Sequence, residues 1–347
     1  MVGALTDTRK QRTDAPLLTV KDLVVQFPVR GNRKALVHAV DGVSFEIYPK
    51  ETFGLIGESG SGKSTVARAI SRLIKPVSGS ITLGDVRLDE LTARQLRRHR
   101  HRFQMIFQDP NEALDPRMTV RSSIAEPMRI QGHIDRAFER KTVDELLERV
   151  GLDPEHGDRH PHELSGGQRQ RVNIARALTL NPELLICDEV VSALDVSIQA
   201  DILNLFTRLQ AELDLSYLFI THDLSVVAHI SDRIGVMYLG RLMEISPTED
   251  LVARPGHPYS EALLSAEPQA MPSTHRTDDR IILQGELPSP ITPPSGCVFH
   301  TRCQYATDRC RNEVPVLRIT APNRWVACHH TDDLQLKGTA ERRSTAE

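Results

Sequence analysis

Long apolar runs are absent from this 347-residue chain, and no stretch approaches the about 18 consecutive apolar residues that cross a bilayer. An excess of charge of one sign is absent too, since 43 lysines and arginines face 46 aspartates and glutamates, for a net charge of −3. The chain itself is therefore not expected to cross a membrane, and no global basic field points to a nucleic-acid partner. With 39% hydrophobic and 26% charged residues, the composition predicts a globular protein of two or three compact units.

A secretory signal is also missing, because the segment from Met1 to Pro16 is polar. We expect a cytoplasmic chain with a loose N-terminal tail over residues 1–16. Cysteines are few, and disulfides fit such a reducing compartment badly. Cys187 stands alone, and four cysteines crowd into the last sixth of the chain, namely Cys297, Cys303, Cys310 and Cys328. That cluster requires an explanation other than disulfide bonding.

From residue 17 to about 255, short apolar runs rich in β-branched residues alternate with helical periodicity, which is typical of an α/β layer structure. A helix is predicted from Ile198 to Leu213, where the apolar residues form a one-sided stripe that Asp195 or Ser197 would cap. Strands are predicted at four places, Thr52–Ile56, Phe103–Phe107, Leu184–Cys187 and Tyr217–Thr221.

The strand signal fades between Asp109 and His162, where a helix with Val143, Leu146, Leu147 and Val150 on one face is predicted to end at Gly151. We therefore expect a helical subdomain over about residues 109–180, inserted into an α/β core that spans 17–255. Beyond Pro255 prolines gather, and a polar stretch runs from Ser273 to Arg280. This texture predicts a small loop-rich C-terminal domain over 256–335 and a tail over 336–347.

A glycine-rich loop lies between the predicted strand Thr52–Ile56 and a helical stretch. It matches the motif G-x-x-x-x-G-K-[ST]. In this motif the backbone N–H groups and the helix N-terminus point at phosphates. Lys63 would bridge the β- and γ-phosphates, and the Ser64 hydroxyl would ligate Mg²⁺. The alternative is an ordinary glycine-rich turn with a surface lysine. The predicted nucleotide-binding residues are Gly57, Glu58, Ser59, Gly60, Ser61, Gly62, Lys63, Ser64 and Thr65.

Two carboxylates, Asp188 and Glu189, end the apolar strand that begins at Leu184. Asp188 is placed to hold Mg²⁺, directly or through water, and Glu189 to polarise an attacking water as general base. A solvated strand terminus is the alternative, although it is disfavoured downstream of a phosphate loop in one α/β core. Cys187 on the same strand is most simply a small buried hydrophobic residue.

A serine and two glycines precede the helical run from Val172 to Leu178, and they predict a second anion site at a helix N-terminus. The same residues would otherwise be a helix cap followed by a hinge. The segment consists of Leu164, Ser165, Gly166, Gly167 and Gln168.

These motifs, in this order, closely resemble those of the ATP-binding cassette (ABC) ATPases, over residues 17 to about 250. The resemblance implies a P-loop NTPase core of ABC type with ATP and Mg²⁺ as cofactors. It implies that Gln108 senses the γ-phosphate beside Mg²⁺, that His222 contacts the γ-phosphate, and that Asp195 belongs to the loop between two protomers, Ser192-Ala193-Leu194-Asp195. A loop amide, a core histidine and a helix cap are the respective alternatives.

In that family two cassettes pack head to tail, so that the signature of one protomer covers the ATP held by the other. One copy in this chain therefore implies dimerisation, with closure on ATP and reopening after hydrolysis. An aromatic residue that stacks on adenine is expected upstream of the phosphate loop. Phe27 is the candidate, and core packing is its alternative role.

Two segments, Arg254–Leu264 and Gly285–Pro290, resemble the C-terminal extension of oligopeptide and dipeptide importer ATPases. The resemblance implies a second ABC ATPase, commonly a paralogue, two transmembrane permease subunits and an extracytoplasmic peptide-binding protein. It places the chain peripherally at the cytoplasmic face of the membrane. One departure is Val190, where this subfamily usually has proline after the catalytic glutamate, and we still expect a competent site because Glu189 is present.

Other functions stay open at this stage. Nickel and glutathione importers use very similar ATPases, and nothing in the sequence reports on the solute. A soluble ABC ATPase of translation, DNA repair or iron–sulfur assembly is disfavoured, because the chain has one cassette, a proline-rich extension and no sustained heptads between Lys63 and Ser165. The basic run Arg97–Arg102 has no interleaved aromatics, so a solvated helix end is favoured over a nucleic-acid patch.

The four clustered cysteines follow the spacing C-x₅-C-x₆-C-x₁₇-C, which is neither a zinc C-x₂-C pair nor a common ferredoxin run. Four thiolates would hold a [4Fe-4S] cluster or tetrahedral zinc. The resemblance to cluster-bearing members of the importer group favours iron and sulfur. Two alternatives remain, a mixed zinc site that uses His300, His329 or His330, and four unligated thiols.

Overall fold

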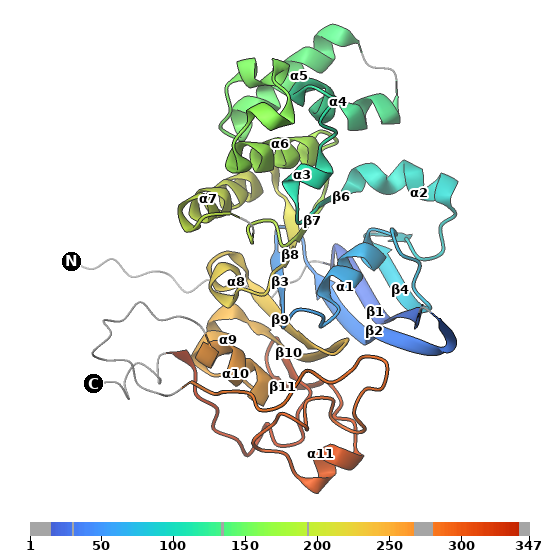
Figure 1. Cartoon of the computed structure of the whole chain (residues 1–347), viewed down its shortest axis with the longest axis vertical. Coiled ribbons are helices and arrows are strands. Elements are labelled where there is room, and N and C mark those ends of the chain that lie inside the picture. The colour runs from blue at the N-terminus through green and yellow to red at the C-terminus, as the bar shows by residue number, and fades with distance from the viewer. Residues whose placement is uncertain (1–14, 30, 133–134, 193, 267–279, 340–347) are drawn as a thin grey trace, which may run out of the picture.

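The computed structural model describes residues 15–29, 31–132, 135–192, 194–266 and 280–339 (Figure 1). Most of the expected tails, most of the polar stretch from Ser273 to Arg280, and Ala193 lie outside the described residues. The strands are β1 (Leu18–Val29), β2 (Asn32–Ile47), β3 (Thr52–Ile56), β4 (Ser78–Leu83), β5 (Val86–Arg87), β6 (Phe103–Ile106), β7 (Leu184–Asp188), β8 (Ser216–Ile220), β9 (Arg233–Tyr238), β10 (Arg241–Pro247), β11 (Arg318–Ala321) and β12 (Arg324–Val326).

The α-helices are α1 (Lys63–Ile70), α2 (Ala93–His99), α3 (Pro110–Ala113), α4 (Val120–Gln131), α5 (Arg136–Arg149), α6 (Gly166–Leu178), α7 (Val196–Leu213), α8 (Leu224–Ile230), α9 (Thr248–Ala253), α10 (Pro258–Ala266) and α11 (Asp308–Asn312). Short 3₁₀ helices are η1 (Arg100–Arg102), η2 (Pro154–Asp158) and η3 (Pro161–Glu163).

The central sheet has eight strands in the order β11-β12-β10-β9-β3-β8-β7-β6. Strands β6, β7, β8, β3 and β9 pair in parallel, whereas β10, β12 and β11 continue the sheet antiparallel. Every residue of β3, β7 and β8 is buried, as expected for parallel strands covered on both faces. The four predicted strands are confirmed with end shifts of one residue, and so is the α/β fold class.

A second, antiparallel sheet has the order β2-β1-β4-β5. Its buried side chains, such as Val20, Val43 and Phe45, share one apolar core with α1 and with one face of the central sheet. The phenylalanine rings of Phe45 and Phe53 stack across this junction, with centroids 4.9 Å apart. Helix α1, which follows the phosphate loop, therefore packs in the core that both sheets share.

Helices α3 to α6 form an arm beyond β6 and β7, at the top of the view in Figure 1. Val143, Leu146 and Leu147 of α5 are buried in the core of this arm, which confirms the helical face predicted for them. The helix ends where predicted, since Gly151 follows it with a φ of +74°. The helix predicted from Ile198 is α7, and its N-cap residue is Asp195.

The C-terminal region wraps the opposite end of the sheet from this arm (Figure 1). Strand β12 pairs with β10 through Glu244 and Ile245, so the region expected to be loop-rich also extends the core sheet. Within the described part of the chain, no helix is both long and apolar enough to span a membrane. The basic run ends α2 and forms η1, with Arg97 and Arg98 exposed, which agrees with a solvated helix end.

Candidate functional site

The phosphate loop is shaped by glycine at the start of α1. Gly62 is the N-cap residue with a φ of +103°, and a Cβ built on it would lie 2.1 Å from the carbonyl oxygen of Ala39. Only glycine fits such a position without displacing the backbone. No side chain caps this helix, so the N–H groups of its first turn are available to an anion bound in the loop.

Lys63 is folded back into its own loop. Its Nζ donates hydrogen bonds to the carbonyl oxygens of Gly57 at 2.7 Å and Glu58 at 3.0 Å, and lies 3.3 Å from Ser61 Oγ. Burial lowers the pKa of Lys63, and the neighbouring carboxylates of Glu189, Asp188 and Glu58 oppose that shift. A buried ammonium held by neutral oxygens is well suited to an anionic ligand.

The side chains of Ser64 and Asp188 meet, although they come from different strand–loop units. Ser64 Oγ donates to Asp188 Oδ1 at 2.8 Å. Burial raises the pKa of Asp188, and the hydrogen bond from Ser64 opposes that shift. A hydroxyl in the first turn of α1 and a carboxylate at the carboxyl end of β7 lie side by side and provide the oxygen ligands that Mg²⁺ prefers beside phosphates.

Glu189 follows β7 and is held between two side chains from other loops. Gln108 Nε2 donates to Glu189 Oε2 at 2.7 Å, and His222 Nδ1 lies 3.3 Å from Glu189 Oε1. The backbone of Glu189 has a φ of +51°, an unusual value for a residue with a side chain and one found at functional sites. His222 is half-exposed, so it is not a core histidine.

Ser165 caps helix α6, in agreement with the alternative noted for it. Its Oγ accepts a hydrogen bond from Gln168 N–H at 3.3 Å, and the Gln168 side chain accepts from Ser165 N–H at 2.9 Å. This reciprocal pair leaves other N–H groups of the first turn available. Figure 1 places α6 in the helical arm, away from α1, the helix that follows the phosphate loop.

Of two other predicted residues, one packs against the core and the other stands at the start of a helix. Phe27 is half-buried in β1 and packs against the core shared by the two sheets. Asp195 begins α7, but its side chain makes no capping hydrogen bond. Its neighbour Ser192 donates from Oγ to the carbonyl oxygen of Glu189 at 2.9 Å, which ties this loop to the carboxylate site.

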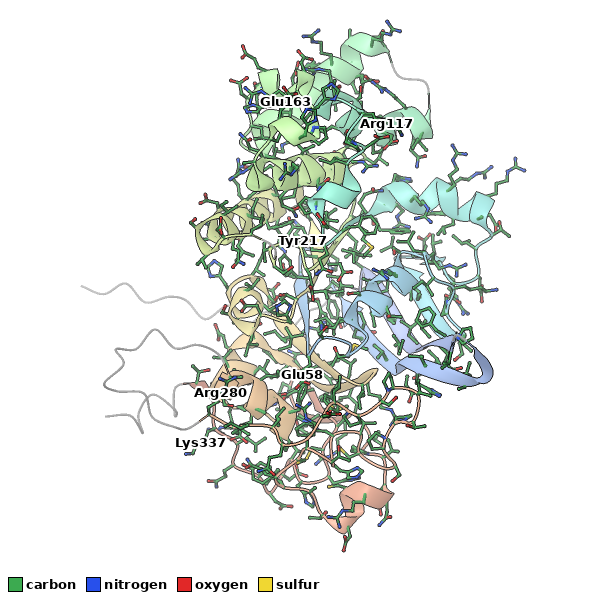
Figure 2. The ribbon with its side chains drawn as sticks, viewed as in Figure 1. Glu58, Arg117, Glu163, Tyr217, Arg280 and Lys337 are labelled. Carbon is green, nitrogen blue, oxygen red and sulfur yellow. The ribbon has the colours of Figure 1, made fainter. Side chains whose placement is uncertain are left out.

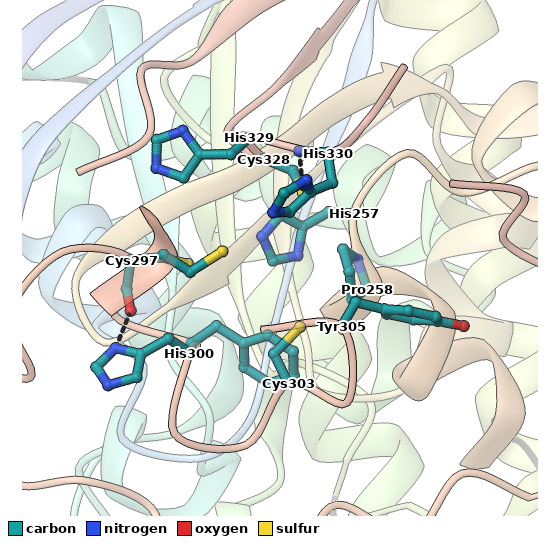
Figure 3. Close-up of a pocket in the computed structure, with 11 residues that line it drawn as sticks. His257, Pro258, Cys297, His300, Cys303, Tyr305, Cys328, His329 and His330 are labelled. Atoms are coloured by element: carbon teal, nitrogen blue, oxygen red, sulfur yellow. Dashed lines mark hydrogen bonds between the residues drawn. The ribbon is translucent and has the colours of Figure 1, made fainter. Parts of the chain in front are cut away.

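The four clustered cysteines line one cavity, together with His257, His300, His329 and His330 (Figure 3). Cys297 N–H donates to the carbonyl oxygen of Cys310 at 2.8 Å. Gly296 permits this approach, because its φ is +63° and a Cβ there would lie 2.4 Å from that same oxygen. Burial raises the pKa of Cys303 to about 12 and that of Cys328 to about 11.

The imidazoles around the cavity bond to protein groups. His300 Nδ1 lies 2.8 Å from the carbonyl oxygen of Cys297, and His329 Nε2 lies 3.0 Å from that of Glu313. His330 Nε2 lies 2.9 Å from Thr307 Oγ1, and the backbone N–H of His330 donates to Cys328 Sγ at 3.4 Å. Within the described ranges, no three His, Cys, Asp or Glu side chains form a group that could hold a metal ion.

Sequence reasoning missed two side chains of the C-terminal region that contact the phosphate loop. Glu58, labelled in Figure 2, accepts from Arg302 through both carboxylate oxygens, and its backbone N–H donates to Tyr259 Oη. Tyr259 lies in a segment noted for its family resemblance, but local spacing carries no signal that it reaches a loop 201 positions away.

Comparison with known proteins identifies two regions. Residues 40–192 match the family described as ABC transporter, and residues 243–310 match the C-terminal region of oligopeptide/dipeptide transporters. The chain is 51% identical over 318 residues to the oligopeptide transport ATP-binding protein AppF of Bacillus subtilis, covering 90% of this chain and 97% of that protein. It is 53% identical over 315 residues to YkfD of the same bacterium, covering 90% and 95%.

Solved structures agree with this assignment. A dimeric ATP-binding cassette bound to ADP and phosphate aligns with a TM-score of 0.61 and 28% identity, over 67% of this chain and 98% of the other. A cassette from Clostridium perfringens, part of an ABC transporter complex, gives the same score and identity over 69% and 91%. The chain therefore belongs to the ATPase family of ABC transporters and has the P-loop core of its ATP-hydrolysing subunits.

Proposed function

We propose that this chain is the ATP-hydrolysing subunit that energises import of oligopeptides or dipeptides through separate transmembrane subunits. One observation carries the proposal: a C-terminal region that matches oligopeptide/dipeptide transporters is packed directly on the phosphate loop of an ABC site. The relatives that match over 90% of this chain include one named for oligopeptide transport.

In the proposed mechanism the phosphate loop, Gly57 to Thr65, cradles the phosphates with its backbone, and Lys63 exchanges its carbonyl partners for β- and γ-oxygens. Ser64, Asp188 and Gln108 would hold Mg²⁺, which would supply positive charge beside the phosphates. Phe27 stacks on the adenine ring.

Glu189 acts as the general base. Gln108 and His222 hold its carboxylate in one orientation, which prepares it to accept a proton from water once the two partners move away. When ATP binds, Gln108 and His222 are positioned to turn toward the γ-phosphate and release the carboxylate to that water.

The site is completed by a second cassette. The N-terminus of α6, with Leu164, Ser165, Gly166, Gly167 and Gln168, lies in the helical arm away from α1 and covers the ATP of the opposing protomer. Asp195 lies in the loop between the two. The partners are a second ABC ATPase, a paralogue in our proposal, two permease subunits and an extracytoplasmic peptide-binding protein, which place the chain at the cytoplasmic face of the membrane.

The cysteine cavity is proposed to hold a [4Fe-4S] cluster through Cys297, Cys303, Cys310 and Cys328. Four thiols on one cavity match the donor set of such a cluster, and the backbone N–H of His330 donates to Cys328 sulfur, which opposes the rise that burial causes in the pKa of this thiol. Among the described residues these side chains do not form a ready metal-binding group, so the cluster would have to draw the four thiols together. When bound, it would cross-link the loops that carry them.

Affinity purification from gently solubilised membranes of the source cell tests the transport proposal. We expect two multi-spanning proteins, a second cassette ATPase and an extracytoplasmic binding protein to co-purify. If that binding protein held nickel or glutathione, the peptide assignment would be wrong. Ribosomal or DNA-repair factors without membrane subunits would refute the transport role altogether.

Anaerobic purification tests the cluster. About four iron and four sulfide per chain, with a visible absorption band that disappears on oxidation, is the expected result. One zinc per chain with no visible band would assign the cavity to zinc. A chain that carried neither iron nor zinc would have four free thiols there.

A further inference from the structure

Two side chains of the C-terminal region form hydrogen bonds with one residue of the phosphate loop, Glu58. Tyr259 Oη accepts the Glu58 backbone N–H at 2.8 Å. Arg302 Nη1 donates to the two carboxylate oxygens of Glu58 at 3.0 and 2.8 Å. The two side chains come from separate segments, α10 and the loop before α11. Their contacts with Glu58 therefore depend on the folded C-terminal region as a whole.

These contacts are partly sheltered from water, with the Glu58 side chain 28% exposed, and sheltered contacts are stronger than exposed ones. The Tyr259 ring is fully buried against the rings of Tyr238 and Phe299, with centroids 4.8 and 5.2 Å away. The guanidinium of Arg302 lies 5.9 Å from the centroid of the Tyr238 ring, and its side chain is only 10% exposed. By contrast, the Arg309–Glu313 ion pair of the same region is exposed on both sides.

On the loop side, the contacts act next to the residue that binds phosphate. The carbonyl oxygen of Glu58 accepts a hydrogen bond from Lys63 Nζ at 3.0 Å, so the same residue that the C-terminal region holds also sets the position of that ammonium. A shift of Glu58 would therefore displace a group that must meet the phosphates.

On the other side, both contacts lead to the cysteine cavity. Cys303 directly follows Arg302, and it lines the cavity. Tyr259 N–H donates to His257 Nδ1 at 3.0 Å, and the His257 ring faces the same cavity (Figure 3). Two short connections thus run from the cavity wall to Glu58.

We infer that Tyr259 and Arg302 are positioning residues for the phosphate loop. Through these two residues, the conformation of the cysteine cavity and the binding of ATP influence each other. The inference rests on the proposed ATP site, but not on which group the cysteines hold. Because coupling between two sites is reciprocal, ATP must also act on the segment that carries Cys303.

Equilibrium ATP binding to the purified full chain tests the inference. Arg302→Gln and Tyr259→Phe are each expected to weaken ATP binding by about tenfold, within the range typical of coupled sites. Arg302→Lys keeps a cationic donor and is expected to recover part of that loss. Glu58→Gln combined with Arg302→Gln is expected to be no worse than either alone, because both remove the same ion pair. Arg309→Gln and Tyr48→Phe, which remove an exposed pair and a hydrogen bond to Glu46, are the matched controls.

Steady-state kinetics separates positioning from a general loss of structure. We expect KM for ATP to rise about tenfold in Arg302→Gln with little change in kcat, since the general base is untouched. Hydrogen exchange of residues 297–303 gives the reciprocal readout: ATP slows exchange there in the wild type but not in Arg302→Gln.

Unchanged ATP affinity in both variants, or equal ATP protection of residues 297–303 in wild type and Arg302→Gln, would overturn the inference and leave the ATPase intact. Failure of the wild type to bind ATP at all would instead refute the proposed function.

Discussion

Gln108 and Glu189 come from loops that follow neighbouring parallel strands, and Gln108 Nε2 donates to Glu189 Oε2 at 2.7 Å. The pairing of β6 with β7 brings these two residues together at one edge of the sheet. A glutamine that donates to the carboxylate holds it in one orientation without neutralising it. The carboxylate therefore stays available as a base, whereas an arginine in that place would form an ion pair with it.

Substituting Glu189 by glutamine tests this role. Glu189→Gln keeps the size of the side chain but cannot take a proton, so ATP hydrolysis is expected to fall by about 100-fold or more. ATP binding persists, and an ATP-bound dimer is expected to accumulate, seen by size-exclusion chromatography with light scattering. Glu212→Gln, on the exposed face of α7, is the control. Hydrolysis at the wild-type rate in Glu189→Gln would show that another group is the base.

Loss of the Lys63 ammonium should act on binding instead. Lys63→Ala removes the buried cation that faces the phosphates, and the dissociation constant for ATP is expected to rise by more than about tenfold. Isothermal titration calorimetry measures it, with Lys141→Ala as the control because Lys141 is well exposed on α5. Equal affinity of the two variants would place the phosphates elsewhere.

The backbone at Gly62 gives a third prediction. Gly62→Ala forces a Cβ to within 2.1 Å of the Ala39 carbonyl oxygen at a positive φ, so the loop must shift. We expect ATP binding to be lost and the free energy of unfolding to fall by about 2 kcal/mol. Gly132→Ala is the matched control, since a Cβ added at Gly132 would meet nothing within 4 Å. Similar stability and ATP affinity of both variants would contradict the claim that only glycine fits at position 62.

A buried ion pair lies at the start of strands β3 and β9, at the opposite end of β3 from the phosphate loop. Arg233 Nε donates to Glu51 Oε1 at 2.7 Å, both side chains are at most 9% exposed, and the guanidinium also donates to the Glu46 carbonyl oxygen. Arg233→Met leaves Glu51 buried without that cation and is expected to lower the free energy of unfolding by about 3–5 kcal/mol.

Urea denaturation measures this loss. Lys50→Met, which breaks the exposed Lys50–Asp214 pair, is the control and should cost less than about 1 kcal/mol. Equal effects of the two substitutions would mean that burial of the Arg233 pair contributes nothing to stability.

Patterns within short stretches of sequence were sufficient to predict individual strands and helix ends. The strand at Thr52–Ile56 and the end of α5 before Gly151 follow from apolar periodicity and from one glycine. The motif residues Lys63, Ser64 and Asp188 were predicted because phosphate and magnesium chemistry restricts residue type at fixed spacing.

Long-range relationships were not predictable in the same way. The pairing of β12 with β10 joins segments about 80 residues apart, and short strands of this kind carry little signal of their own. Glu189 combines a positive φ with a hydrogen bond from its N–H to the carbonyl oxygen of Ile220, a residue 31 positions away. The contacts of Tyr259 and Arg302 with Glu58 depend on tertiary folding, so no spacing in the sequence announces them.

Peptide uptake tests the central claim most directly. Source cells that lack this chain, and the same cells complemented with the wild type or with Glu189→Gln, are supplied with a radiolabelled oligopeptide, and the initial rate of its accumulation is measured. We predict that uptake is lost without the chain, restored by the wild type and not restored by Glu189→Gln. Uptake that is unchanged without the chain, or restored equally by Glu189→Gln, would contradict the account that ATP hydrolysis by this subunit drives peptide import.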